Sequence, residues 1–283
     1  MALKELPGVP NQNLLFGKAA LTSFFRSGDT LPETEYVLKD LAIDGAKLAE
    51  YNKVCGFGLR DALPATYIHT LAGPVHLQLM TDPGFPFAAT GLVHIRNQIT
   101  QHRPVTTGEK LTITVKLADL RAHDKGTQFD VVASASVGGE TVWDGVSTIL
   151  KRGKSTTSSE GGAKAPKEAA APQEPNAVWP LPGDLGWSYA GVSGDYNPIH
   201  LNPITAKLFG FPRNIAHGMW SKARCLAAFE GRLPEKFTVD VSFKLPILLP
   251  AKVAFTSTEA AGGFDFALTD ARKGKPHLAG TIR

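Results

Sequence analysis

The feature that most constrains the fold is an order of elements that occurs twice in the chain. In the second part, the helical stretch "GMWSKARCLAAFEG" (218–231) precedes alternating and β-branched runs that begin "KFTVDVSFKLPILLP" (236–250). In the first part, "IHTLAGPVHLQLM" (68–80) precedes "TGLVHIRNQITQHRPVTTGEKLTITVKLAD" (90–119). Apolar spacing predicts a helix and then strands in each part. A helix followed by an antiparallel sheet is an α+β pattern, and its recurrence favours an internal duplication.

A segment of different composition separates the two copies. Residues 154–177 are rich in Ser, Gly, Ala, Pro, Lys and Glu and contain no aromatic residue. Such a segment buries too little apolar surface to offset its ordering entropy. We therefore predict an N-terminal repeat over 1–153, a flexible linker over 154–177 and a C-terminal repeat over 178–283.

Charge, cysteine content and hydropathy indicate which partners and which cellular compartment to expect. The net charge is +4, with Lys and Arg scattered along the chain, so no nucleic-acid partner is expected. Only Cys55 and Cys225 are present, which fits a reducing compartment, although a bridge between them stays open. The chain has neither a signal-peptide pattern nor an apolar run long enough to span a membrane. We expect a cytoplasmic protein.

The segment "SGDYNPIH" (193–200) carries a carboxylate, an amide and an imidazole within six residues, Asp195 to His200. Pro198 fixes its own φ and pushes Asn197 toward an extended backbone, so the loop can present Asp195 and His200 on one side. A surface turn could use the same residues without any catalytic role. Directly after it, Asn202–Pro203 has the pattern of a helix N-cap followed by a proline at the first helical position.

The stretch "YAGVSGDYNPIHLNPITAKLFGFPRNIAHGMW" (189–220), with the later "VSFKLPILLP" (241–250), resembles the MaoC-like, or hydratase 2, family. The resemblance implies a double hotdog, in which each repeat is a long central helix wrapped by an antiparallel sheet. It also implies (R)-specific hydration of trans-2-enoyl thioesters, or the reverse dehydration of (R)-3-hydroxyacyl thioesters, in fatty-acid metabolism. The activity would be that of a hydro-lyase.

The corresponding first-half segment, "YNKVCGFGLRDALPATYIH" (51–69), lacks the Asp-x-Asn-Pro-x-His spacing. It resembles a degenerate hotdog repeat, which implies one active site per chain. Spacing among Tyr51, Asp61, His69 and His76 does not support a second site, and we interpret these histidines as structural. The same interpretation applies to His94, and no metal site is predicted.

Hydration of an enoyl thioester needs water at C3, a proton at C2 and stabilisation of charge on the thioester oxygen. Asp195 and His200 are the candidate acid and base. Gly218, at the start of a helix, has an N–H without an acceptor in the first turn, which suits an oxyanion. Asn197 would hold the loop or contact the substrate, and His217 is interpreted as a packing or hydrogen-bonding residue.

The expected partner is an acyl thioester, on coenzyme A or on an acyl carrier protein, with phosphopantetheine as part of the substrate and no further cofactor. Arg213, Lys222, Arg224 and Lys244 are candidate carrier contacts because they are near the motif in sequence, although each also fits an ordinary surface position. A homodimer of double-hotdog chains is one assembly to test. Two alternatives stay open, a hotdog thioesterase and a non-catalytic acyl-thioester-binding subunit.

Overall fold

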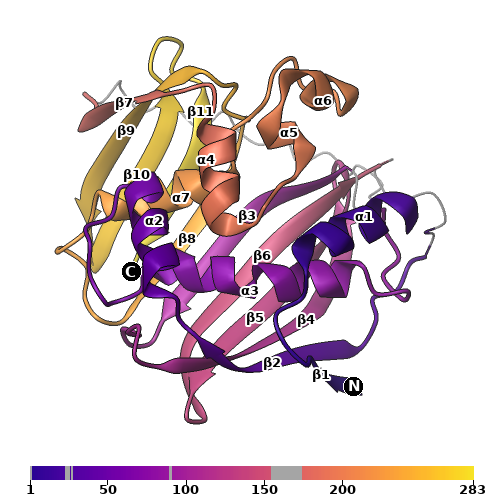
Figure 1. Cartoon of the computed structure of the whole chain (residues 1–283). Coiled ribbons are helices and arrows are strands. Elements are labelled where there is room, and N and C mark those ends of the chain that lie inside the picture. The colour runs from indigo at the N-terminus through magenta and orange to yellow at the C-terminus, as the bar shows by residue number, and fades with distance from the viewer. Residues whose placement is uncertain (1, 23–25, 27, 89–90, 154–173) are drawn as a thin grey trace.

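The computed structural model describes residues 2–22, 26, 28–88, 91–153 and 174–283 (Figure 1). The first half contains, in chain order, β1 (Ala2–Glu5), α1 (Gln12–Thr22), β2 (Thr34–Ala42), α2 (Gly45–Cys55), α3 (Ala65–Met80), β3 (Leu92–Gln101), β4 (Lys110–His123), β5 (Gly126–Val137) and β6 (Glu140–Arg152). The second half contains β7 (Ala177–Leu181), α4 (Leu185–Ser193), α5 (Pro198–Leu201), α6 (Pro203–Leu208), α7 (Gly218–Ala227), β8 (Phe237–Phe243), β9 (Ala251–Ala260), β10 (Gly263–Asp270) and β11 (Pro276–Ile282). Helices followed by antiparallel strands in each half confirm the α+β class.

Most of the segment predicted to be a linker lies outside the described residues. The structure describes the chain up to Gly153 and again from Glu174. Strand β7 begins at Ala177, the last residue of the predicted segment, and Asn176 already accepts a hydrogen bond from the Ser257 amide at 2.6 Å. The end of this segment is therefore part of the second half.

The strands form one eleven-stranded sheet in the order β1-β2-β4-β5-β6-β3-β8-β11-β10-β9-β7. Strand β1 pairs with β2 in parallel, and β3 pairs with β8 antiparallel at the centre of the sheet. Outward from this central pair, the order β6, β5, β4, β2 on one side matches β11, β10, β9, β7 on the other. This matching order is what a duplicated unit would produce.

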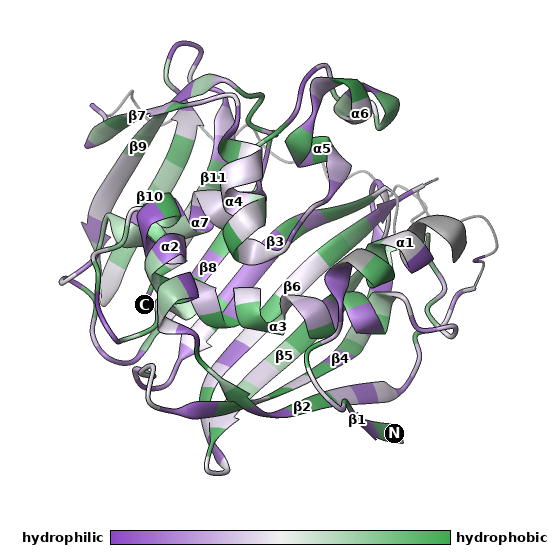
Figure 2. Cartoon of the chain, viewed as in Figure 1, coloured by the Kyte–Doolittle hydropathy of each residue, from purple (hydrophilic) through white to green (hydrophobic). Residues whose placement is uncertain are grey.

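The core forms where helices cross the sheet. Along β4, Leu111, Ile113, Val115 and Leu117 are buried, and residues between them are less so, as the two-residue period of a strand requires. Helix α3 crosses the first-half strands (Figures 1 and 2), and its N-terminal carbonyl, on Ala65, accepts a hydrogen bond at 2.8 Å from the indole of the buried Trp143. The sheet thus holds the first turn of α3 in place.

A buried lysine forms hydrogen bonds to strands of both halves. Lys222 on α7 is fully buried, and its Nζ donates to Asn97 Oδ1 at 2.6 Å, to the Asn97 carbonyl at 3.0 Å and to the Val239 carbonyl at 3.1 Å. Asn97 lies on β3 and Val239 on β8, so the ammonium group bridges the central strand pair. Its interpretation as a candidate carrier contact is wrong, because these three oxygens hold it in the core.

Two further expectations can be compared with the structure. Cys55 and Cys225 are both buried free thiols, so the bridge that the sequence left open is absent. Within the described ranges, no helix is both long and apolar enough to cross a membrane.

Candidate active site

The loop that carries the candidate residues begins at the end of α4. Gly194 ends this helix in the left-handed conformation with φ of 73°, and its N–H donates to the Ala190 carbonyl at 2.8 Å. Glycine adopts this conformation without the strain that a side chain would bring, and a Cβ there would also displace the Gln12 amide. The chain then turns directly into Asp195.

Asp195 stabilises its own turn and leaves half of its side chain exposed. Its Oδ1 accepts from the Asn197 N–H at 3.2 Å, and 48% of the side chain is accessible. Asn197 in turn caps α5, because its Oδ1 accepts from the Ile199 N–H at 3.3 Å, with Pro198 at the first helical position. The amide of Asn197 therefore holds the loop, and its assignment as a substrate contact stays a prediction.

The segment after the motif has the helix start that the sequence predicted. Asn202 caps α6 by accepting from the Ile204 N–H at 2.7 Å, and Pro203 is the first residue of that helix. With the cap of α5, this makes two consecutive Asn-Pro pairs, each of which begins a short helix. His200, in the last turn of α5, is therefore fixed between two helix starts.

The environment of His200 sets its tautomer. Its Nδ1 lies 2.8 Å from the Ile215 carbonyl, and because a carbonyl only accepts, Nδ1 carries the proton. The Nε2 atom then has a free lone pair. Burial lowers the pKa of His200 from 6.5, although Asp195 and the bond to Ile215 oppose this. The ring is therefore neutral at pH 7 and suited to accept a proton.

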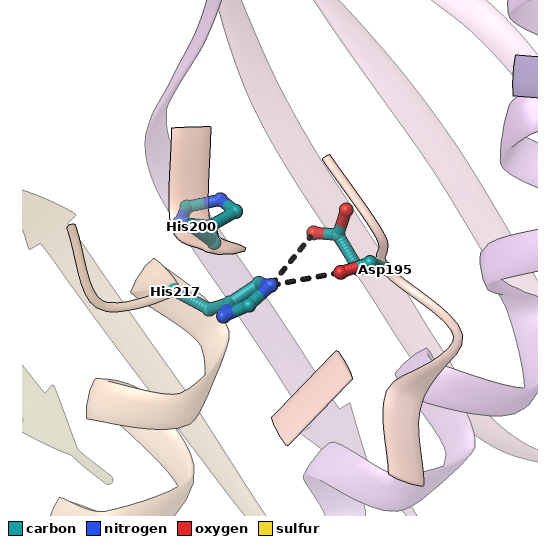
Figure 3. A group of neighbouring side chains, drawn as sticks. All are labelled: Asp195, His200 and His217. Carbon is teal, nitrogen blue, oxygen red and sulfur yellow. Dashed lines mark hydrogen bonds and ion pairs between the residues drawn. The ribbon is translucent and has the colours of Figure 1, made fainter. Parts of the chain in front are cut away.

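His217 lies beside both of the other two side chains (Figure 3). Its Nε2 donates to the Asp195 carbonyl at 2.9 Å and lies 3.8 Å from Asp195 Oδ2, and its ring stacks on that of His200 with centroids 3.7 Å apart. Burial, with a smaller effect of His200, lowers the pKa of His217 to about 3. The interpretation as a hydrogen-bonding residue is confirmed, but its position inside the group was not predicted. Its place directly before Gly218 was the available signal.

Gly218 is the first residue of α7, and His217 is its N-cap. The Gly218 N–H lies in the first turn, where the helix offers no acceptor, and the helix dipole adds partial positive charge. A Cβ at this position would lie 3.1 Å from the ring of Phe243. Glycine therefore keeps the helix start close to Phe243 and leaves the N–H available to an anion.

The three side chains could also hold a cation. Asp195, His200 and His217 each bring one ligand atom within 4.8 Å of the others. A divalent transition metal would use one imidazole lone pair from each histidine together with the carboxylate. The absence of a metal site therefore stays a prediction.

The candidate residues of the first half do not assemble in the same way. Asp61 is exposed, and Tyr51 is buried among other aromatic rings. His69 and His76 do lie together, with His94, in a separate group of buried rings. The sequence contains no motif spacing that would have grouped these three histidines.

Three candidate carrier contacts remain once Lys222 is set aside. Of these, Arg213 and Lys244 are exposed. Arg224 is partly buried, with its guanidinium 4.3 Å from the ring centroid of Trp179. Two of the four therefore remain open to a carrier.

Comparison with known proteins agrees with this geometry. A model of the MaoC-like domain matches residues 166–263, which contain Asp195, His200, His217 and Gly218. The 3-hydroxyacyl-thioester dehydratase X of Mycobacterium tuberculosis is 39% identical over 272 residues, which are 96% of this chain and 97% of the relative. The chain belongs to the MaoC-like family.

Two further similarities extend the comparison. The (R)-specific enoyl-CoA hydratase of Aeromonas caviae is 34% identical over 70 residues, which are 23% of this chain and 52% of the relative. A crystal structure of HtdX from Mycobacterium tuberculosis has a TM-score of 0.78 at 38% identity and covers 88% of this chain and 99% of that chain. The hotdog fold implied by the sequence resemblance is confirmed.

Proposed function

We propose that the chain is a hydro-lyase that adds water to trans-2-enoyl thioesters to give (R)-3-hydroxyacyl thioesters, and that also catalyses the reverse dehydration. The observation that carries this proposal is the gathering of Asp195, His200 and His217 at the N-terminus of α7. The names of the two curated relatives, a 3-hydroxyacyl-thioester dehydratase and an (R)-specific enoyl-CoA hydratase, support both directions.

The geometry supports a separate role for each group of the site in the hydration reaction. A water held between His200 Nε2 and the Asp195 carboxylate loses a proton to one of them as its oxygen bonds to C3. The enolate charge that develops on the thioester oxygen is stabilised by the Gly218 N–H. A proton returns to C2, so that one water is consumed and H and OH are added across the double bond.

His217 supports the pair without taking part in proton transfer. Its Nε2–H is used by the Asp195 carbonyl, and its stacked ring keeps His200 in position. Because its pKa is lowered to about 3, it stays neutral and adds no charge beside the base. The first half supplies no second set of these groups, so we infer one active site per chain.

The carrier stays outside the buried part of the site. Coenzyme A and acyl carrier protein both present a phosphopantetheine arm with negative charge, for which the exposed Arg213 and Lys244 are suitable partners. No other cofactor is needed for the addition of water. A homodimer of double-hotdog chains completes the proposal, and size-exclusion chromatography with light scattering tests it.

The deciding experiment follows the loss of enoyl-thioester absorbance across a series of trans-2-enoyl-CoA chain lengths, with chiral analysis of the product. The proposal expects (R)-3-hydroxyacyl-CoA with the thioester intact. Release of free coenzyme A without hydration would identify a thioesterase instead. Tight binding without turnover would identify a binding subunit.

A further inference from the structure

Three histidines outside the catalytic group form a cluster of their own, which we name the histidine cluster: His69 and His76 on α3 and His94 on β3. The rings of His69 and His76 have centroids 5.1 Å apart, and those of His69 and His94 lie 6.2 Å apart. His69 and His76 are seven residues apart on one helix, which places them two turns apart on the same side. The cluster thus joins the inner side of α3 to the central strand pair.

Each ring of the histidine cluster has an unpaired nitrogen. His69 Nδ1, His76 Nε2 and His94 Nε2 are buried and have no hydrogen-bond partner. Most buried polar atoms are paired, and three unpaired atoms in one place indicate that something polar belongs there. His69 and His94 are partly buried as whole residues, but their unpaired ring nitrogens lie in the interior.

The chemistry of the cluster restricts what it can bind. Burial lowers the pKa of His76 to about 4 and that of His94 to about 3, and Lys222 adds to the effect on His94. The rings are therefore neutral at pH 7, and the unpaired nitrogen of each ring is either an N–H donor or a lone-pair acceptor, depending on the tautomer. An uncharged oxygen function, such as a hydroxyl or a carbonyl group, matches this set without bringing a charge into the interior.

The histidine cluster adjoins the catalytic group. The ring of His94 packs edge-on against Phe243 with centroids 5.0 Å apart, and Phe243 is the ring that faces the Gly218 Cα. The Asp195 carboxylate is close enough to oppose, as the smallest of several effects, the lowering of the His94 pKa that burial causes. A substrate with its thioester oxygen at Gly218 would therefore have the cluster within the reach of its acyl chain, while its charged carrier stays at the surface.

We propose that His69, His76 and His94 form a subsite for a hydroxyl or carbonyl oxygen on the acyl chain beyond C3. This inference rests on the proposed function, because it takes the thioester to be bound at Gly218. The corresponding substrate class is an acyl thioester with an oxygen function on its chain, in preference to a plain alkyl chain of the same length. A chain without that oxygen would leave the three nitrogens unpaired.

Binding and turnover are measured separately, so that the two proposals can fail independently. Dissociation constants are determined by calorimetry for saturated acyl-CoA and for isomers of the same length that carry one hydroxyl at successive positions. At least one isomer should bind about tenfold more tightly than the plain chain, since each buried hydrogen bond contributes a factor of this order. Turnover of plain trans-2-enoyl-CoA, measured in parallel, tests the proposed function alone.

The variants His94→Leu and His76→Leu should bring the two affinities to within about twofold of each other. His123→Leu, at the last residue of β4 and outside the cluster, is the matched control and should keep the preference. Circular dichroism checks the folding of each variant. Equal binding of the plain chain and of every isomer by the wild type would overturn the subsite, as would an unchanged preference in a folded cluster variant.

Discussion

The two halves diverge directly after the same kind of helix end. In both, a helix ends at a left-handed glycine, Gly56 after α2 and Gly194 after α4, with φ of 82° and 73°. Each glycine N–H bonds a carbonyl four residues earlier, of Asn52 and Ala190 respectively. After Gly56 the chain passes to α3 without a further helix, whereas after Gly194 two short helices come first. The helix and its glycine end belong to the shared scaffold, and the chemistry comes from the residues beyond the glycine.

The polar groups under the long helices also differ between the halves. At the start of α7, His217 and Gly218 meet Asp195 and His200, with hydrogen bonds to backbone carbonyls that fix each ring. Under α3, each residue of the histidine cluster has one buried ring nitrogen without a hydrogen-bond partner. Hydrogen bonds to backbone carbonyls therefore set the tautomers of the second-half imidazoles, whereas our proposal assigns the first-half imidazoles to a ligand.

The largest effect is expected from removing the groups that only the second half has. His200→Ala and Asp195→Asn should each lower kcat/KM for trans-2-enoyl-CoA by about 10³-fold. Asparagine keeps an oxygen for the Asn197 N–H, so the turn survives in the second variant. Asp61→Asn, an exposed change in the first half, is the control and should retain wild-type activity. Near wild-type kcat in either site variant would refute the acid–base assignment.

A smaller loss is expected at the first residue of the long helix. In Gly218→Ala the new Cβ would lie 3.1 Å from the Phe243 ring, so the ring or the helix start must move by a few tenths of an ångström beside the proposed oxyanion donor. We expect kcat to fall by about 10²-fold. Gly45→Ala changes the first residue of α2, where a Cβ meets nothing within 4 Å, and should leave kcat unchanged. Equal kinetics of the two variants would remove Gly218 from the mechanism.

The sequence predicted the elements better than the contacts between them. The order of helix and strands, the caps of Asn202 and Pro203, and the Asp195-to-His200 motif all depend on neighbours within a few residues, which is the range that spacing and turn chemistry describe. Lys222 shows the limit of such reasoning. Its oxygen partners on Asn97 and Val239 come from two other elements, so a lysine on an amphipathic helix was assigned to the surface.

The histidine cluster is a second case in which the sequence did not predict a contact between distant elements. His69 and His76 are one helix-face pair, but His94 reaches them from β3. Taken singly, each histidine near apolar residues fits a structural role. Only the packing of α3 across the sheet brings the three unpaired nitrogens together. The second-half motif was recognised because its residues are neighbours in the sequence, whereas the three histidines of the first half are brought together only by the fold.

The smallest effect is expected in the pH dependence of stability, and it comes from the first half. Burial alone lowers the pKa of His76 from 6.5 to about 4. The unfolded chain therefore takes up a proton there near pH 6.5, and the folded chain does so only near pH 4. As the pH falls through this window, unfolding becomes more favourable by about 1.4 kcal/mol per pH unit for this one group, and above pH 6.5 the contribution is constant.

His76→Leu should therefore lose less free energy of unfolding between pH 7.5 and 5.0 than the wild type does. The measurement is urea unfolding at the two pH values, and taking the difference cancels any constant cost of the substitution itself. His123→Leu, outside the histidine cluster, should lose as much as the wild type. If His76→Leu also did so, the imidazole of His76 would have to be protonated in the folded chain at pH 5.0. A charged ring of that kind would bind an anion in preference to a hydroxyl group, and the contrast between the two halves would then be one of charge.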